Sequence, residues 1–137
     1  MRTETPEVGL DRPDVVAEVR AAFGRYERAL VDGDVATLTE LFWDDPRCLR
    51  YGVADRQRGA AQIAAWRARH PSVPAGRRLR DTHVLAVDDR TAVVNTLFDY
   101  PDGRVEGRQT QVWVRFAEGW RIVSAHVSEI VPEIPAG

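Results

Sequence analysis

The sequence contains no lysine, because all 19 of its basic residues are arginines. This absence excludes Schiff-base catalysis, a lysine-anchored pyridoxal phosphate and a phosphate-binding loop that needs a lysine. No apolar run approaches the ~20 residues of a membrane-spanning helix, and the amino terminus lacks the basic and apolar segments of a signal peptide. We therefore expect a cytoplasmic protein without a membrane partner.

Cysteine and histidine are also scarce. The single cysteine, Cys48, excludes an internal disulfide, and His70, His83 and His126 lack the spacing of metal ligands. The net charge of −2 and the isoelectric point near 5.9 argue against a nucleic-acid-binding surface. We expect no metal, no other cofactor and no nucleic-acid partner.

The length of 137 residues suits one domain, so any ligand pocket has to form inside that domain. Residues 1–12 are polar and predict a flexible arm. The domain is expected over residues 13–131, with a short tail over residues 132–137.

The first half of the chain has the hydrophobic period of helices. Apolar residues at three- and four-residue steps predict an amphipathic helix over residues 13–32. Gly33 is a left-handed helix stop, and Asp34 is an N-cap for a second helix over residues 35–42. A third helix is predicted over residues 59–69.

The second half alternates with a period of two, which indicates strands. A short strand at residues 48–52 is followed, after the third helix, by strands over residues 79–87, 92–100, 105–116 and 119–130. Turn residues between the long strands predict a simple antiparallel meander. The fold class is therefore α+β, with three helices on one face of a strongly curved, mainly antiparallel sheet that encloses a cone-shaped pocket.

Tyr26 lies in the apolar stripe of the first helix, so its hydroxyl needs a partner in the core or in the pocket. It is either a core tyrosine bonded to a carbonyl group or a donor to a ligand. With an ordinary pKa near ~10 it acts as a donor unless nearby arginines lower that value. The adjacent Glu27 lies off the inward stripe, so no catalytic carboxylate pair is expected.

Arg50 belongs to a short strand that is too apolar to be a solvated face. An inward guanidinium requires an internal carboxylate or an anionic ligand, because an uncompensated buried charge costs several kcal/mol. A salt bridge to Glu27 or Asp44 is the alternative. Arg67 raises the same question more weakly.

Four further residues are candidates for the pocket wall. His126 shares a predicted strand face with Trp120, and it is either a wall residue or a structural histidine. Gln111 and Trp113 alternate along one strand, which suits a pocket wall or a dimer face. Trp43 is the fourth candidate.

The order of elements resembles the cystatin-like cone shared by nuclear transport factor two, scytalone dehydratase, ketosteroid isomerase and the polyketide cyclases. Six segments together resemble the narrower AtzH and HpxZ family. They are FGRYERAL from Phe23, ELFW from Glu40, RYG from Arg50, GAAQIAAWR from Gly59, GRQTQVWVR from Gly107 and GWRIVSAHVS from Gly119.

This resemblance implies a small, cofactor-free protein that works beside amidases in cyanuric acid or oxalurate catabolism. It further implies a decarboxylating amidohydrolase that converts 1,3-dicarboxyurea to allophanate, with Tyr26 and Arg50 in the positions of the family's functional tyrosine and arginine. Trp66 departs from the phenylalanine expected in the family, which leaves the substrate's size open. The substrate would be a small ureido anion.

Two other functions are consistent with the same sequence. One is a non-catalytic accessory protein that binds a small anion and supports a partner amidase. The other is an isomerase, dehydratase or cyclase acting on a hydrophobic ring, which would need an inward aspartate or a histidine–aspartate pair.

A homodimer through the sheet face is expected, because Val112, Val114, Val123 and Val127 would form a large apolar patch on a monomer. Light scattering coupled to size-exclusion chromatography should show a species of twice the chain mass. A single species of 15.4 kDa would reject the dimer.

Overall fold

The computed structural model describes residues 9–131, so residues 1–8 of the predicted arm and the predicted tail at 132–137 lie outside it. Asp11, which belongs to the predicted arm, is held by Ala86. The backbone N–H of Asp11 donates to the Ala86 carbonyl at 2.8 Å, and its carboxylate accepts from the Ala86 N–H at 3.0 Å. This part of the arm is therefore attached to the domain.

Three helices occupy the predicted segments: α1 (Pro13–Asp32), α2 (Val35–Leu41) and α3 (Ala60–Arg69). Gly33 ends α1 at a φ of 70°, a left-handed conformation that glycine adopts without strain. Asp34 caps α2, and its carboxylate accepts a hydrogen bond from the backbone N–H of Thr37 at 3.1 Å. Both predicted helix ends are confirmed. No helix in residues 9–131 is both long enough and apolar enough to cross a membrane.

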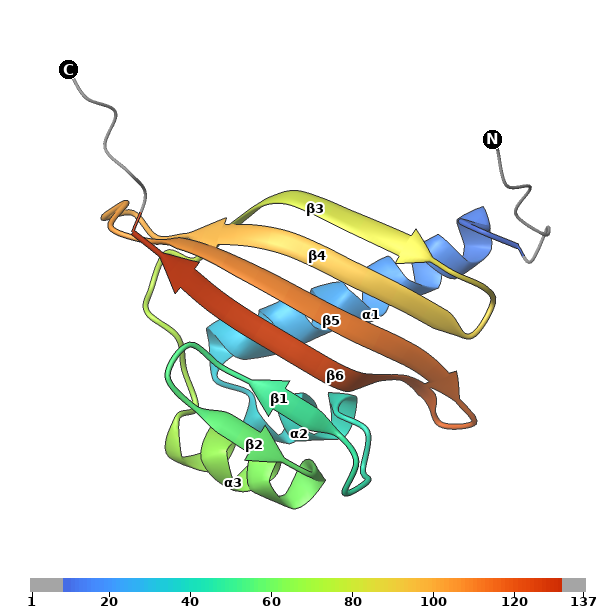
Figure 1. The fold of residues 1–137 in the computed structure, drawn as a ribbon, viewed down its shortest axis with the longest axis horizontal. Helices are drawn as coiled ribbons and strands as arrows, with labels where there is room; N and C mark the ends of the chain where they lie inside the picture. The colour runs from blue at the N-terminus through green and yellow to red at the C-terminus, as the bar shows by residue number, and fades with distance from the viewer. Residues whose placement is uncertain (1–8, 132–137) are drawn as a thin grey trace, which may run out of the picture.

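The sheet has six strands in the order β2-β1-β6-β5-β4-β3. They are β1 (Leu49–Tyr51), β2 (Arg56–Arg58), β3 (Arg78–Ala86), β4 (Thr91–Asp99), β5 (Glu106–Phe116) and β6 (Gly119–Ile130). Helix α1 lies across one face of β3 to β6, while α2 and α3 lie near β1 and β2 beyond the β6 edge (Figure 1). The α+β class, with helices on one face of a mainly antiparallel sheet, is confirmed.

The simple meander is corrected at the β6 edge of the sheet. Strand β1 pairs with β6 in parallel, and β2, which was not predicted, pairs antiparallel with β1. Three-residue strands carry too little periodicity to be recognised from sequence, and parallel pairing depends on contacts about 75 residues apart in the chain. This small hairpin extends the sheet and closes one side of the cone.

The core lies between α1 and the concave face of the sheet. Val19 and Phe23 of α1 are buried in one apolar cluster with Trp113 and Ile122 of the sheet. Cys48 is fully buried in the same cluster, where burial raises the pKa of its thiol to about 11. The thiol is therefore protonated at neutral pH and structural in role.

A β-bulge in β6 decides which of its side chains face the core. Trp113 pairs with Ile122 whereas Val112 pairs with Ser124, so Val123 is an extra residue in β6. One extra residue reverses the alternation of faces.

The reversal corrects two predictions. His126 is exposed on the outer face, edge-on to the ring of Tyr51 at 5.9 Å, and Val127 instead lines a cavity inside the cone. The predicted outer apolar patch therefore loses Val127. The dimer itself stays a prediction.

Replacing Gly107 with alanine should destabilise the fold, because a Cβ there would overlap the ring of Phe98 on the paired strand. We expect Gly107→Ala to lower the free energy of unfolding in urea by roughly 1–3 kcal/mol. Gly24→Ala is the matched control: nothing lies within 4 Å of a Cβ on this helical glycine. That change should raise stability by about 0.5–1 kcal/mol. Equal effects at both positions would contradict this packing.

Candidate active site

A cavity of about 210 Å³ opens at the end of the cone where α1 finishes. Its walls come from α1, β1, α3, the sheet and the segment that joins α3 to β3. The polar groups that define its chemistry are Tyr26, Arg50, Arg67 and Arg77. The structure thus brings together Tyr26 and Arg50, the two residues predicted to be catalytic, and adds Arg67 from the predicted pocket residues.

Tyr26 lies in the cavity wall with 3% of its surface exposed, and its ring meets Phe42 edge-on at 6.2 Å. No hydrogen bond joins its hydroxyl to another group in residues 9–131, so the carbonyl-bonded alternative is not realised there and the hydroxyl is open to the cavity. Burial raises the pKa of Tyr26, and this effect outweighs the opposing attraction of Arg67 and Arg50. The hydroxyl is therefore protonated at neutral pH and oriented as a donor.

The Arg50 side chain is compensated within the β1–β2 hairpin. Its Nη1 donates to the carboxylate of Asp55 at 2.6 Å and to the side-chain carbonyl of Gln57 at 2.8 Å. Gln57 also donates to Asp55 at 2.8 Å, which closes a three-residue network. The hydrogen bonds from Gln57 and Arg50 hold the pKa of Asp55 below its ordinary value despite partial burial. Asp55, rather than Glu27 or Asp44, is the partner of Arg50.

Arg77, just before β3, is compensated by Glu27 of α1. The guanidinium forms a two-point ion pair with the carboxylate at 2.9 and 3.2 Å, and it donates to Gln109 of β5 at 3.1 Å. Burial disfavours the charged Arg77, but the contact with Glu27 outweighs it and raises the Arg77 pKa. Glu27 is buried, which corrects the expectation that it lies off the inward stripe. Removing either partner would leave a buried charge, at a cost of about 3–5 kcal/mol.

Arg67 of α3 differs from the other two arginines of the cavity. It is 5% exposed and has no carboxylate within salt-bridge distance in the described part of the chain. Burial lowers the pKa of Arg67, the direction opposite to that of Arg77. The guanidinium groups of Arg50 and Arg67 lie 4.3 and 4.9 Å from the centroid of the Trp66 ring. Trp66 therefore contacts both of these arginines, which line the same cavity.

Four predicted pocket residues lie elsewhere. His126 faces outward because of the bulge in β6, and Trp43 stacks on Phe116 at 5.5 Å in a different cavity. Gln111 and Trp113 are buried in the core, where the indole N–H donates to the Gln111 side chain at 3.1 Å. Neighbouring core side chains surround Gln111 and Trp113, so neither residue reaches the cavity.

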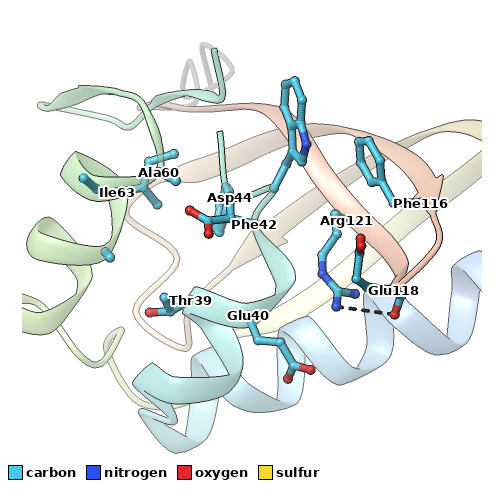
Figure 2. Close-up of a pocket in the computed structure, with 12 residues that line it drawn as sticks. Thr39, Glu40, Phe42, Asp44, Ala60, Ile63, Phe116, Glu118 and Arg121 are labelled. Carbon is cyan, nitrogen blue, oxygen red and sulfur yellow. Dashed lines mark hydrogen bonds between the residues drawn. The ribbon is translucent and has the colours of Figure 1, made fainter. Parts of the chain in front are cut away.

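The cavity that contains Trp43 is larger, about 790 Å³, and lies between α2, α3 and the hairpin that joins β5 to β6 (Figure 2). Its charged groups are occupied or exposed. Glu40 pairs with Arg25 at 2.6 Å, and Arg121 donates to the carbonyls of Trp120 and Glu118. None of these contacts presents a desolvated polar group to a ligand, so the smaller cavity is the better candidate for chemistry.

Within residues 9–131, no three side chains of histidine, cysteine, aspartate or glutamate come together as a metal site. The cavity instead offers a phenol and guanidinium groups, which recognise anions directly. Comparison with known families gives a match between residues 8–133 and the AtzH-like family. The chain belongs to the AtzH-like family.

Solved structures resemble this AtzH-like protein closely. A cystatin-like fold protein from Burkholderia xenovorans LB400 is 44% identical, with a TM-score of 0.87 over 90% of this chain and 98% of that chain. A protein with unknown function from Pectobacterium atrosepticum SCRI1043 is 43% identical, with a TM-score of 0.87 over 93% and 99% of the two chains.

A more distant structure shares the fold alone. An NTF2-like protein of unknown function from Pseudomonas putida KT2440 is 16% identical, with a TM-score of 0.73 over 90% and 98% of the chains. No curated protein matches the AtzH-like chain.

Four residues that shape the cavity are not among the predicted site residues: Asp55, Gln57, Arg77 and Gln109. The sequence pattern does indicate a pocket-wall position for Gln109, since it lies in the same alternating row as Gln111 and Trp113. No such pattern marks the others, because their roles depend on partners that the fold brings close.

Alkaline titration of the AtzH-like protein, followed by tyrosinate absorbance, should show one tyrosine that ionises above its ordinary value near 10. Tyr26→Phe should remove that transition. Tyr51→Phe, which changes an exposed tyrosine outside the cavity, should leave it in place. Loss of a transition below pH 10 in Tyr26→Phe would mean that the arginines outweigh burial.

Proposed function

We propose that this AtzH-like protein is a cofactor-independent decarboxylating amidohydrolase that acts on a small N-carboxylated urea, of the type that converts 1,3-dicarboxyurea to allophanate. The observation that carries the proposal is the protonated, unpartnered Tyr26 hydroxyl in a cavity of about 210 Å³ with Arg50. The cavity is small enough to favour a ureido anion over a polycyclic ring. A cytoplasmic location and a functional link to an amidase belong to the same proposal.

The reaction needs a proton donor at one nitrogen. The bond between this nitrogen and the carboxyl carbon breaks, its electron pair stays on the nitrogen, and carbon dioxide leaves. The nitrogen takes one proton, so the dianion plus one proton gives allophanate and carbon dioxide. The Tyr26 hydroxyl donates toward the nitrogen or the adjacent carbonyl oxygen as negative charge develops there, and solvent supplies the proton overall.

Arg50 supplies orientation. Nη1 is occupied by Asp55 and Gln57, which fix the plane of the guanidinium, and Trp66 supports it at 4.3 Å. The remaining N–H groups of the planar fork suit a carboxylate or a urea carbonyl. A guanidinium held in this way loses little conformational entropy when substrate binds.

Non-catalytic binding of a small anion is the second candidate. The raised pKa of Tyr26 favours it, because a phenol that ionises reluctantly donates a hydrogen bond better than it transfers a proton. A ring isomerase or cyclase is less consistent with the cavity. Glu27, which follows Tyr26 in α1, and Asp55, in the cavity wall, are both engaged with arginines and are poor bases.

The purified protein should release carbon dioxide and allophanate from 1,3-dicarboxyurea faster than buffer does. We expect Tyr26→Phe to lower kcat by roughly 10²–10³-fold, because it removes the donor to the developing charge. Arg50→Lys, which keeps the charge beside Asp55 but loses the fork, should also lower kcat. Tyr51→Phe and Arg58→Lys change exposed residues and should keep wild-type rates.

A wild-type rate equal to that of buffer, with substrate intact at the start, would sink the enzyme proposal. Retained binding of the ureido anion under those conditions would support the accessory function instead. Full activity in Tyr26→Phe would show that another group supplies the proton.

A further inference from the structure

Arg67 is the guanidinium in the cavity that lacks an internal counter-charge. Arg50 pairs with Asp55 at 2.6 Å and Arg77 pairs with Glu27 at 2.9 Å, whereas no salt bridge joins Arg67 to any residue in 9–131. Its hydrogen bond within that range is a 3.3 Å contact from Nη1 to the backbone carbonyl of His70. A cation in this state is stabilised when an anionic ligand enters.

The other carboxylates near Arg67 do not supply that anion. The Asp55 carboxylate is engaged with Arg50 and Gln57, and the Glu27 carboxylate is engaged with Arg77 and Gln109. Glu129 lines the same cavity from β6, and no ion pair connects it to Arg67.

We propose that Arg67 binds the carboxylate that the ureido substrate keeps, while Tyr26 and Arg50 face the carboxylate that leaves. This inference rests on the proposed decarboxylation. Arg50 and Arg67 line the same cavity of about 210 Å³ and lie 4.3 and 4.9 Å from the Trp66 ring centroid, so a small ligand in that cavity contacts both.

The assignment of the two ends follows from where charge moves. Decarboxylation transfers negative charge from the leaving carboxylate to nitrogen, so a full cation paired with that carboxylate would stabilise the substrate more than the transition state. Arg50 is already neutralised by Asp55 and holds the leaving group only weakly. Arg67 retains its full charge and therefore suits the end whose charge does not change.

Binding of a carboxylate by Arg67 can be tested without turnover. Hydantoate carries a urea and one stable carboxylate, and ethylurea is its uncharged counterpart. Calorimetry should show binding of hydantoate to the wild type and much weaker binding of ethylurea. Arg67→Gln should weaken hydantoate binding by at least roughly 30-fold, as expected when one partner of a buried charge pair is removed. Arg69→Gln, an exposed neighbour on α3, should have no effect.

Turnover of 1,3-dicarboxyurea tests which end Arg67 holds. Arg67→Gln should raise KM by at least roughly 30-fold and change kcat little, because it removes binding common to the substrate and the transition state. Arg67→Lys, which keeps the charge, should recover part of the loss. Circular dichroism of each variant checks that it folds.

The outcomes separate this inference from the proposed function. Equal binding of hydantoate and ethylurea to the wild type would show that Arg67 does not bind the retained carboxylate, even if the enzyme turns over. Undiminished hydantoate binding in folded Arg67→Gln would show the same. Arg67-dependent hydantoate binding without turnover would support carboxylate binding by Arg67 and reject the decarboxylation. A rise in both KM and kcat in Arg67→Gln would place Arg67 on the carboxylate that leaves, and a fall in kcat with unchanged KM would place it on the charge that develops in the transition state; either result contradicts the proposal.

Discussion

A guanidinium inside a protein has to be compensated, and the open end of this cone is organised by that requirement. Arg77 meets it by joining the helix layer to the sheet, because its partners Glu27 and Gln109 come from α1 and from β5. Arg50 meets it within a single hairpin, through Asp55 and Gln57. The two networks differ in consequence. The first ties helix to sheet, and the second fixes the orientation of one side chain.

The part of the cavity wall that the sheet forms depends on two backbone features, a bulge in β6 and a glycine in β5. The extra residue Val123 turns Val127 and Glu129 toward the cavity and His126 away from it. Across the sheet, Gly107 gives room for the ring of Phe98, over which the Arg77 guanidinium lies at 4.0 Å. A bulge and a missing Cβ thus determine which groups a ligand meets.

Two cavities of this protein differ in character, and the larger is not the one that contains the buried polar groups. Volume alone would favour the site around Trp43. The chemistry favours the smaller one, where burial raises the pKa of Tyr26 and lowers that of Arg67. Both shifts reflect desolvation, so this cavity is where a charged or hydrogen-bonding ligand gains most from direct contacts.

Much of this protein follows from local sequence. The helix period, the stop at Gly33, the cap at Asp34 and the alternation of the long strands are properties of neighbouring residues, and the structure bears them out. The inward direction of Tyr26 follows from its place in the helix stripe. Burial of Arg50 is consistent with its short apolar strand.

Only the tertiary structure decided which residues form the buried ion pairs and which side chains of β6 face the cavity. The ion pair of Glu27 with Arg77 joins residues 50 positions apart, and no local pattern marks either as buried. The Val123 bulge is visible only in the pairing with β5, and it reversed the expected direction of His126. Local periodicity determines which face of an element is apolar. Charge compensation and strand register depend on which distant segments meet, which is why neither could be inferred from the sequence alone.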